Sequence, residues 1–558
     1  MTNHAVFAVP VVSDLGKPFV TFAPLVESYW PADISTPLRQ ETIGMLLRHA
    51  AATAGERIAL VDGQADPALR TTWSYQELLG AAEAAARALL ERFEPGERVA
   101  IWAPNRAEWV ILQQGLSLAG LVMVALNPNY RRHELSYALQ QSRAAGLFHT
   151  DKYRGFDMAG LVQEIRSELP ELRTTVSFSD WETFLSSGSP DTVLPVVEPL
   201  DPVQIQYTSG TTGFPKGAVL HHYGVVNASA LAGQRAQIAD GAVFVNVMPM
   251  YHIGGGSVTE LGTLAARGTY VLLAEFEPGL HLELIEAYRA THTLAVPTML
   301  MAMLDHPSCG SRDLSSLQVV MSGATVVPAA LVNRTTEAFG CDLIISFGQT
   351  ELHGIISETE VTDSVEDQEN TIGRPIPQVE VAILDPATGV TLPIGQQGEI
   401  CARGYQTMSG YFELPEQTAA TIDFDGWLHT GDLGSMDARG YLRITGRLKD
   451  MIIRGGLNIA PREVEDVLFA HPEVAEVSVV GVPDRKWGEQ VGAVIRLADP
   501  AHPPTSDALR AYCRERIAAF KSPALVFVVD SYPLTPSGKV QKFLLRQAID
   551  NGELTPLP

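Results

Sequence analysis

Residues 207–218 read Tyr207-Thr208-Ser209-Gly210-Thr211-Thr212-Gly213-Phe214-Pro215-Lys216-Gly217-Ala218, a stretch of hydroxyls and glycines with one lysine. Glycines let a backbone approach an anion closely, while hydroxyls and an ammonium group add donors and positive charge. The stretch therefore predicts a phosphate-binding loop. Lys216 is followed by Gly217 and not by serine or threonine, so the stretch is not a Walker A loop. An ordinary P-loop kinase or GTPase is disfavoured.

Five further motifs extend a resemblance that begins at this loop. The loop is similar to the phosphate loop of the adenylate-forming superfamily, which comprises acyl-CoA synthetases, firefly luciferases and peptide-synthetase adenylation domains. The other motifs follow in the family's order at compatible spacing: Met250-Tyr251-His252, Ser346-Phe347-Gly348-Gln349-Thr350-Glu351, His429-Thr430-Gly431-Asp432, Gly446-Arg447-Leu448-Lys449-Asp450 and Pro536-Ser537-Gly538-Lys539. The resemblance implies an α/β protein, with a large N-terminal body of layered α/β subdomains and a small mobile α+β C-terminal domain.

The periodicity of the chain supports this fold class. Apolar residues at helical spacing predict a helix over residues 74–93, with Ser74 and Glu77 as a capping box. A strand over 98–102, a helix over 106–118 and a strand over 122–126 follow, and such alternation is typical of layers around largely parallel sheets.

The pattern of expected helices and strands changes after residue 450, which indicates a second structural unit. We expect a helix from Pro461 to about Phe469, strands near 477–481 and 491–497, a helix near 506–519 and a strand at 525–530. With 558 residues the chain is too long for one core. By the resemblance we place an AMP-binding domain at 1–446, a hinge at 447–451 centred on Asp450, and a lid domain at 452–558.

Composition excludes several classes of function. A formal net charge of −24 disfavours nucleic acid as a partner. The four cysteines are scattered and predict neither a disulfide framework nor a CxxC metal site. No apolar run is long enough to span a bilayer, and residues 1–6 show no secretory signal, so a cytoplasmic enzyme is expected. Oligomeric state stays open, with a homodimer possible.

The resemblance assigns a role to most of the motif residues. It implies that the loop holds the β and γ phosphates of ATP and that Glu351, with Thr208, binds Mg²⁺. Phe347 is expected to stack on adenine, in place of the family's usual tyrosine, and Asp432 is expected to accept hydrogen bonds from the ribose hydroxyls. Lys539 corresponds to the essential adenylation lysine. The implied ATP/AMP-binding set is Thr208, Ser209, Gly210, Thr211, Thr212, Gly213, Lys216, Gly323, Ala324, Phe347, Gly348, Gln349, Thr350, Asp432, Arg447 and Lys539. The implied catalytic set is Lys539, Lys216, Glu351 and His252.

The same resemblance implies sites for the acid and for coenzyme A. His252, Gly255 and Gly323 are expected to line the acyl pocket, where the run 253–257 removes side-chain bulk, and Arg454, Gly455 and Gly456 are expected to approach CoA. Structural alternatives stay open at this stage. His252 could be a core histidine, residues 322–324 a strand-to-turn junction, and the two glycines a simple β-turn.

These expectations converge on an ATP-dependent acyl-CoA synthetase that forms an acyl-adenylate and then a thioester. Because His252 stands where amino-acid activators carry an aspartate, we expect a plain apolar acid, with a medium or long fatty acid first and an aryl or cyclic, for example steroid-derived, acid second. Nothing in the sequence resembles a carrier domain, so CoA is the expected acceptor. The alternatives are an acyl-AMP ligase that serves a carrier protein, a luciferase-like enzyme and a silent nucleotide-binding regulator.

Overall fold

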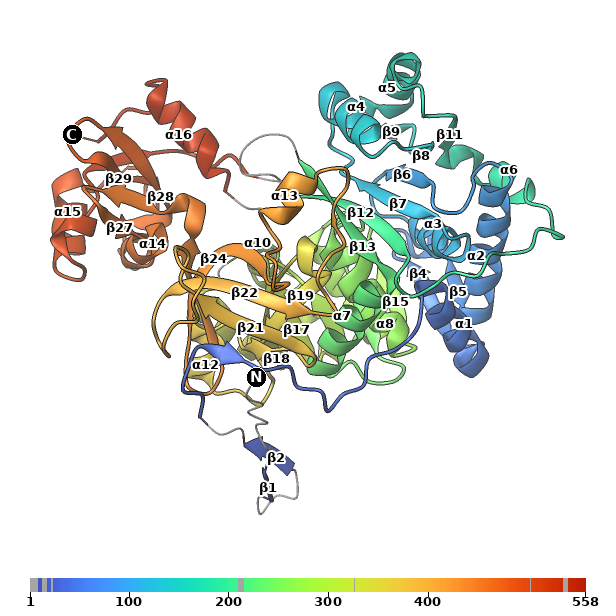
Figure 1. Ribbon diagram of the computed structural model, residues 1–558, viewed down its shortest axis with the longest axis horizontal. Coiled ribbons are helices and arrows are strands. Elements are labelled where there is room, and N and C mark those ends of the chain that lie inside the picture. The colour runs from blue at the N-terminus through green and yellow to red at the C-terminus, as the bar shows by residue number, and fades with distance from the viewer. Residues whose placement is uncertain are drawn as a thin grey trace. The chain divides into compact units, whose positions relative to one another are not determined.

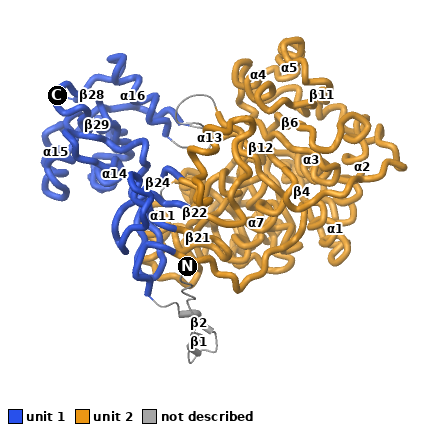
Figure 2. The backbone as a smooth tube through the Cα atoms, in the orientation of Figure 1, with its two compact units in different colours: residues 1–29, 382–401, 430–558 blue, residues 30–381, 402–429 orange. Residues whose placement is uncertain are grey.

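The computed structural model describes residues 9–12, 18–21, 24–208, 215–325, 327–501, 503–534 and 540–557, with side chains from residue 24 onward. Two compact units are drawn in different colours in Figure 2. Unit 1 comprises Met1–Tyr29, Ala382–Cys401 and Thr430–Pro558, and unit 2 comprises Trp30–Val381 and Ala402–His429. Among the described residues, no helix combines the length and the hydropathy that crossing a membrane requires.

Unit 2 contains a largely parallel sheet that ends at the predicted phosphate loop. Its described strands run in the order β11 (Thr174–Ser177), β8 (Gly146–His149), β6 (Arg98–Trp102), β7 (Val122–Leu126), β12 (Pro202–Thr208), β13 (Lys216–His221) and β23 (Gly410–Tyr411). The first five are parallel, whereas β13 and β23 add antiparallel edges. The strands predicted at 98–102 and 122–126 are confirmed as β6 and β7.

A second sheet of unit 2 carries the other central motif. Its described strands run in the order β20 (Arg374–Pro375), β19 (Gly354–Glu358), β18 (Asp342–Gln349), β17 (Val319–Gly323), β16 (His292–Leu294), β14 (Val243–Asn246), β15 (Thr269–Leu272), β4 (Ile58–Asp62) and β5 (Thr72–Ser74). The strands from β18 to β4 are parallel. The fully buried Val245, Val271 and Val320 anchor a core on these strands.

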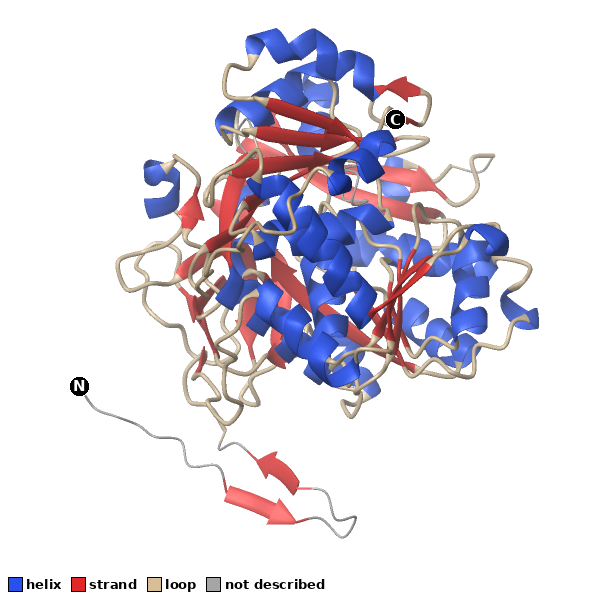
Figure 3. Cartoon of the chain, turned by 90° about the vertical axis from the view of Figure 1, so that its right-hand side faces the viewer, coloured by secondary structure: helices blue, strands red, loops and turns tan. Residues whose placement is uncertain are grey.

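Helices pack on these sheets (Figures 1 and 3). Those described in unit 2 are α1 (Ile43–Ala54), α2 (Tyr75–Leu90), α3 (Ala107–Leu118), α4 (Arg132–Gln141), α5 (Met158–Ile165), α6 (Trp181–Ser186), α7 (His222–Arg235), α8 (Glu260–Ala265), α9 (Pro278–Tyr288), α10 (Pro297–Asp305), α11 (Ala329–Phe339), α12 (Val365–Asn370) and α13 (Pro415–Ala419). Helix α2 begins with the predicted capping box, in which Ser74 and Glu77 satisfy each other's backbone N–H groups. It turns Leu78, Ala82 and Leu89 into the core.

A buried carboxyl group lies at the start of α8. Glu260 is 4% exposed, and its two oxygens accept hydrogen bonds from Gln114 Nε2 at 2.8 Å and Gln113 Nε2 at 3.2 Å. Burial raises the pKa of Glu260 to about 8, because a charged carboxylate loses solvation that two neutral amides do not replace. The Glu260 carboxyl is therefore protonated at neutral pH.

We expect the Glu260→Gln variant to be more stable than the parent enzyme at pH 8 and about equally stable at pH 4.5. A pKa raised above its unfolded value contributes stability that is complete below pH 4.5 and is lost as the pH rises toward 8, at roughly 1.4 kcal/mol per pH unit. The neutral amide removes this loss. Urea unfolding of both proteins at pH 4.5 and pH 8 measures it, and an equal stability difference at both pH values would contradict the assignment.

The C-terminal part of unit 1 has its own sheet and core. The strand order is β27 (Leu457–Ile459), β26 (Ile452–Arg454), β29 (Gly488–Leu497) and β28 (Val474–Asp484), with β30 (Leu525–Val528) parallel to β29. Helices α14 (Pro461–Phe469), α15 (Ser506–Arg514) and α16 (Lys542–Asp550) accompany the sheet. Ile452, Val464, Leu509 and Val526 are fully buried members of this core. The small α+β C-terminal domain is confirmed.

Local chemistry sets the helix boundaries here. Pro461 begins α14 as predicted, since a helix's first residue needs no backbone N–H donor. The helix expected over 506–519 is shorter than predicted. Helix α15 ends at Arg514, where the pattern of bonds tightens: the Arg516 N–H bonds the Cys513 carbonyl at 2.9 Å, and a separate 3₁₀ turn follows at Ala519–Lys521.

The rest of unit 1 includes residues of four further strands that belong to one sheet. Strand β21 (Val379–Leu384) carries the chain from unit 2 into unit 1, and β22 (Gly398–Gly404), β24 (Leu428–Met436) and β25 (Leu442–Arg447) follow. A 3₁₀ turn at Leu448–Asp450 leads from β25 to β26.

Candidate active site

The two ends of the predicted phosphate loop lie side by side in unit 2. Strands β12 and β13 are antiparallel neighbours, and their register pairs Thr208 with Lys216. Thr208 is the last residue of β12 and Lys216 is the first of β13. The predicted phosphate-binding residues Ser209, Gly210, Thr211, Thr212 and Gly213 lie outside the described residues. The described strand ends nevertheless place a hydroxyl and an ammonium group at one edge of the sheet.

Glu351 meets this edge of the sheet. It lies in the 3₁₀ turn Thr350–Leu352 directly after β18. Thr208 Oγ1 donates a hydrogen bond to Glu351 Oε1 at 3.2 Å, and Tyr411 Oη donates to the same oxygen at 2.8 Å. Lys216 Nζ lies 4.8 Å from the centroid of the Tyr411 ring. Thr208, Lys216, Glu351 and Tyr411 therefore form one cluster, which we call the carboxylate–lysine cluster.

Tyr411 is a site residue that the sequence did not indicate. It lies on β23, which pairs with β13 through Ala218, and it is 8% exposed. Burial, followed by the nearby Glu351 carboxylate, raises the pKa of Tyr411, so the phenol keeps its proton and donates to Glu351. No local pattern around residue 411 predicts this contact, because it depends on pairing between segments about 190 residues apart.

The predicted adenine segment follows the carboxyl ends of two parallel strands. Gly323 ends β17 and pairs with Ser346 of β18, and Phe347 is half-buried. A Cβ at Gly323 would lie 2.2 Å from the Ser346 carbonyl oxygen, and one at Gly348 would lie 1.8 Å from that of Gly354, so both positions require glycine. Ligands of α/β sheets commonly bind at such strand ends.

The backbone after Gly323 forms a turn, as expected if residues 322–324 are a strand-to-turn junction. Ala324 has a φ of +64°, in the left-handed region, directly after β17 ends. Residues 322–324 thus form a strand-to-turn junction. A role beside the nucleotide is compatible with this geometry and stays a prediction.

His252 precedes a π-helix at Gly254–Thr259. Its Nδ1 accepts a hydrogen bond from the Gly254 N–H at 3.2 Å, and its side chain is half-buried. A Cβ at Gly255 would lie 2.4 Å from the Pro249 carbonyl oxygen, and one at Gly256 would lie 2.2 Å from that of Met250. Close backbone approach accounts for these two glycines, and room for the acid at Gly255 stays a prediction.

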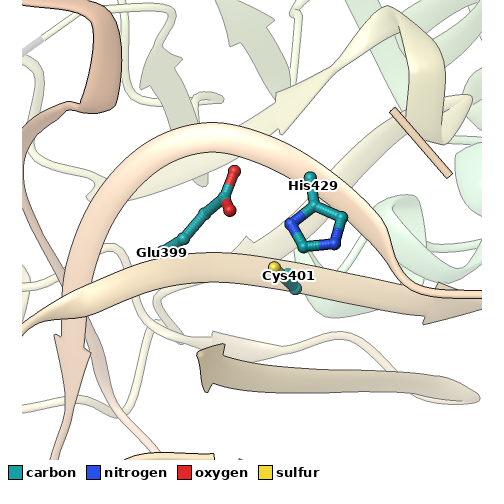
Figure 4. A group of neighbouring side chains, drawn as sticks. All are labelled: Glu399, Cys401 and His429. Carbon is teal, nitrogen blue, oxygen red and sulfur yellow. The ribbon is translucent and has the colours of Figure 1, made fainter. Parts of the chain in front are cut away.

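Unit 1 contains Asp432, predicted to bind the ribose, and Arg447, predicted to reach the nucleotide. Asp432 on β24 pairs with Arg447 on β25, and Arg447 Nε lies 2.9 Å from Asp432 Oδ1. The Asp432 side chain is 6% exposed, whereas that of Arg447 is 46% exposed. The preceding turn is held by Glu399 of β22, whose Oε1 accepts a hydrogen bond from the Gly431 N–H at 2.9 Å. Figure 4 labels Glu399 together with its strand neighbour Cys401.

The glycines predicted to approach CoA form the turn of a hairpin. Gly455 and Gly456 connect β26 to β27 with φ values of +58° and +83°, which two-residue hairpin turns require. Arg454 Nη1 donates to the Phe520 carbonyl at 2.9 Å, and its guanidinium lies 5.3 Å from the Trp487 ring centroid. The β-turn alternative therefore describes the backbone, and contact with CoA stays a prediction.

Lys539 lies outside the described residues, but the chain on either side of it is ordered by contacts. Leu534 and Val540 form an isolated β-bridge, and the Gln541 N–H donates to the Pro533 carbonyl at 2.8 Å. Lys542 Nζ then contacts Glu465 Oε1 of α14 at 2.6 Å. The described flanks of the predicted adenylation lysine are thus fixed to the core of the C-terminal domain.

Comparison with known proteins agrees with these motifs. The family model described as AMP-binding enzyme matches residues 47–412, and the model described as AMP-binding enzyme C-terminal domain matches residues 463–539. The chain is 37% identical over 548 residues to the putative acyl-CoA synthetase YngI of Bacillus subtilis (strain 168), covering 91% of this chain and 97% of YngI.

Other relatives also align over most of both chains. The mitochondrial medium-chain acyl-CoA ligase ACSF2 of Macaca fascicularis is 32% identical, and the alignment covers 94% of this chain and 89% of the ACSF2 chain. A Rhodococcus jostii (strain RHA1) CoA ligase for a propanoyl group with a methyl-dioxo-octahydro-indenyl ring is 36% identical over 90% of this chain and 97% of its own. ATP-bound MatB from Rhodopseudomonas palustris aligns with a TM-score of 0.84 and 28% identity, covering 92% of this chain and 99% of MatB.

The family model spans more than half of the chain, and both the fold and full-length relatives agree with it. The α/β architecture and the superfamily predicted from the motifs are confirmed. This chain belongs to the AMP-binding family of adenylate-forming enzymes, as an acid–thiol ligase.

Proposed function

We propose that the enzyme is an ATP-dependent acyl-CoA synthetase that activates an apolar carboxylic acid of medium or long chain. It joins the acid to AMP with release of pyrophosphate, and it then transfers the acyl group to CoA with release of AMP. The observation that carries the proposal is the carboxylate–lysine cluster, in which Thr208 and Tyr411 donate to Glu351 and Lys216 lies over the Tyr411 ring. The resemblance and the names of the relatives support the reaction.

The first half-reaction brings two anions together, so its main requirement is charge neutralisation. We propose that Lys216 and the loop after Thr208 bind the β and γ phosphates, while Phe347 lies against adenine beside Gly323, Ala324, Gly348, Gln349 and Thr350. Asp432 accepts bonds from the ribose and Arg447 reaches the nucleotide. Lys539 stabilises the charge that develops between carboxylate and α-phosphate.

The cluster is chemically suited to Mg²⁺. Carboxylate and hydroxyl oxygens are the hard donors that this cation prefers. Among the described residues, Thr208 and Tyr411 donate side-chain hydrogen bonds to Glu351, and both bonds reach Oε1. We propose that Glu351 holds Mg²⁺, with Thr208 as a further contact. The cation neutralises phosphate charge when bound.

We propose that the acid lies beside His252, Gly255 and Gly323, and that CoA approaches Arg454, Gly455 and Gly456. The relative named a medium-chain acyl-CoA ligase supports a fatty acid. The relative that acts on a ring-bearing propanoyl group favours a cyclic acid as the second candidate. Both candidates share the same chemistry at the carboxyl group.

A substrate screen tests the function and separates these candidates. The purified enzyme is given Mg²⁺, ATP, CoA and either straight-chain acids of increasing length or bicyclic propanoic acids. Mass spectrometry measures AMP, acyl-AMP and acyl-CoA, and a parallel assay measures ATP–pyrophosphate exchange with each acid. Acyl-CoA from straight-chain acids supports the proposal. Acyl-AMP without acyl-CoA would indicate transfer to a carrier protein, and the absence of pyrophosphate exchange with every acid would indicate a silent nucleotide-binding protein.

We also propose that residues 452–558 act as a lid that rotates about Asp450, with 447–451 as the hinge and 1–446 as the body. The separate core that begins at Ile452 supports a boundary here, and Asp450 ends the short turn between β25 and β26. This boundary falls inside unit 1. A hinge residue absorbs the change in backbone dihedral angles.

We expect the Asp450→Pro variant to slow thioester formation far more than adenylation, because proline fixes φ near −65° at the residue that must change. Single-turnover measurement of pyrophosphate release and of acyl-CoA formation compares the two steps. Asp450→Ala is the matched control, since alanine leaves both dihedral angles free, and it should retain both steps. Equal slowing of both steps by proline would count against a hinge at this residue.

A further inference from the structure

A buried histidine lies two residues after Glu351 and takes part in none of the assigned roles. His353 is 0% exposed and has a φ of +54°, in the left-handed region that few non-glycine residues occupy. The backbone at His353 is therefore in a strained conformation, and this conformation directs the side chain into the interior. Its position at the end of the Glu351 turn calls for a physical explanation.

The imidazole of His353 makes two directional hydrogen bonds. Its Nδ1 lies 2.7 Å from the Gln406 carbonyl oxygen, and its Nε2 lies 3.1 Å from the His221 backbone nitrogen. A carbonyl can only accept and a backbone N–H can only donate, so Nδ1 carries the proton and Nε2 accepts. The ring is therefore the neutral Nδ1–H tautomer, because an Nε2 that accepts the His221 N–H holds no proton.

The two bonds reach two segments that each carry a member of the carboxylate–lysine cluster. His221 is the last residue of β13, the strand that begins with Lys216. Gln406 lies five residues before Tyr411, and between them the Met408 N–H donates to the Glu351 carbonyl at 3.0 Å. His353 itself follows the Glu351 turn. One side chain thus links the segments of Lys216, Glu351 and Tyr411.

The surroundings of the ring fit it closely. A Cβ at Gly224, in the first turn of α7, would lie 2.3 Å from the His353 ring, so only glycine allows the ring there. The His221 ring packs on it with centroids 4.4 Å apart, and His221 Nδ1 accepts a bond from the Gly224 N–H. The ring is therefore held on several sides, as residues that orient a metal ligand commonly are.

We propose that His353 is a positioning residue for the nucleotide–metal site. Its imidazole links β13, the Glu351 turn and the segment before Tyr411, and it thereby fixes the Glu351 carboxylate relative to Lys216. This inference rests on the proposed roles of Glu351 and Lys216. His353 touches neither ATP nor metal, and it acts through the carboxylate. Loss of its bonds would let Glu351 move while Lys216 and the acid site persist.

Three variants separate the two hydrogen bonds. His353→Asn can keep a donor near Nδ1 and tolerates a left-handed φ, His353→Gln can keep an acceptor near Nε2, and His353→Ala loses both. His281 provides the matched control, because it is also fully buried and bonds Thr293 from Nε2 at 2.9 Å, outside the linked segments. The His281→Ala variant should lose stability as His353→Ala does.

The readouts are the KM for MgATP, the KM for the acid, and the Mg²⁺ concentration at half-maximal pyrophosphate exchange, together with Tm. We expect His353→Ala to raise the first and the third by about 10-fold or more, as loss of a residue that orients a metal ligand does, with the KM for the acid nearly unchanged. His353→Asn and His353→Gln should fall between His353→Ala and the parent. His281→Ala should lower Tm without moving either constant.

A folded His353→Ala variant with the parental KM for MgATP and the parental Mg²⁺ concentration at half-maximal exchange would overturn the inference. If that variant does not fold, parental values of both constants for His353→Asn would overturn it. The failure of the proposed function shows differently, as absence of acid-dependent exchange in the parent enzyme itself. In that case calorimetric binding of MgATP to the parent and to His353→Asn still tests the inference, since weakened binding supports it and equal binding contradicts it.

Discussion

The Lys539→Ala variant is expected to form acyl-adenylate at least ~10²–10³-fold more slowly than the parent enzyme while binding ATP nearly as well, since removal of one preorganised charge-stabilising group has effects of this size. Negative charge develops between the carboxylate and the α-phosphate in the transition state, and a lysine stabilises it there as a compact point charge. In the proposed site the ground-state phosphates are held by other groups, in particular Lys216. Acid-dependent pyrophosphate release and calorimetric ATP binding measure the two effects.

Lys486→Ala is the control for this prediction. Lys486 is an exposed lysine of the same C-terminal domain, 4.7 Å from the Trp487 ring centroid, and it takes no part in the proposed adenylation chemistry. Its removal should leave adenylation unchanged. Pyrophosphate release from Lys539→Ala at the parental rate would refute the assignment, and equal loss in both variants would point to a general effect of charge.

The second large effect is expected for Glu351→Gln. The amide keeps the shape of the side chain and still accepts the bonds from Thr208 and Tyr411, so Tm should change little. It no longer offers an anionic oxygen to a cation, and we expect acyl-adenylate formation to fall by about 10²-fold with a marked rise in the Mg²⁺ concentration at half-maximal rate. A Mg²⁺ titration of pyrophosphate release measures both.

Glu337→Gln controls for the loss of one carboxylate from this acidic protein. Glu337 is exposed on α11, and its replacement should leave the Mg²⁺ dependence unchanged. The account of the metal site fails if Glu351→Gln titrates with Mg²⁺ as the parent does, because the carboxylate would then have no part in holding the cation.

Elements with strong local signals were predicted well from the sequence. The capping box of Ser74 and Glu77 begins α2, and β6, β7 and α14 occupy the predicted residues, since short-range chemistry and periodicity determine them. The end of α15 was missed because a change from i−4 to i−3 hydrogen bonding at Arg516 ends the helix. Such a local conformational choice leaves no periodic signal.

The site was predictable only in part, for a different physical reason. The motif residues Thr208, Lys216 and Glu351 were expected near one another because the family resemblance groups them, and the structure brings them together. Tyr411 and His353 contribute through strand pairing and a buried imidazole, which depend on the tertiary fold. A single histidine after a glutamate is not a signal that one sequence can distinguish from an ordinary core residue.

The crystal structure of the full-length enzyme soaked with ATP and Mg²⁺ tests the central claim most directly. We predict that Lys216 Nζ and the Glu351 carboxylate lie within contact of the triphosphate and its cation, on either side of the loop at 209–214. A nucleotide bound elsewhere, with both side chains facing solvent, would contradict the proposed activation of an acid at this site.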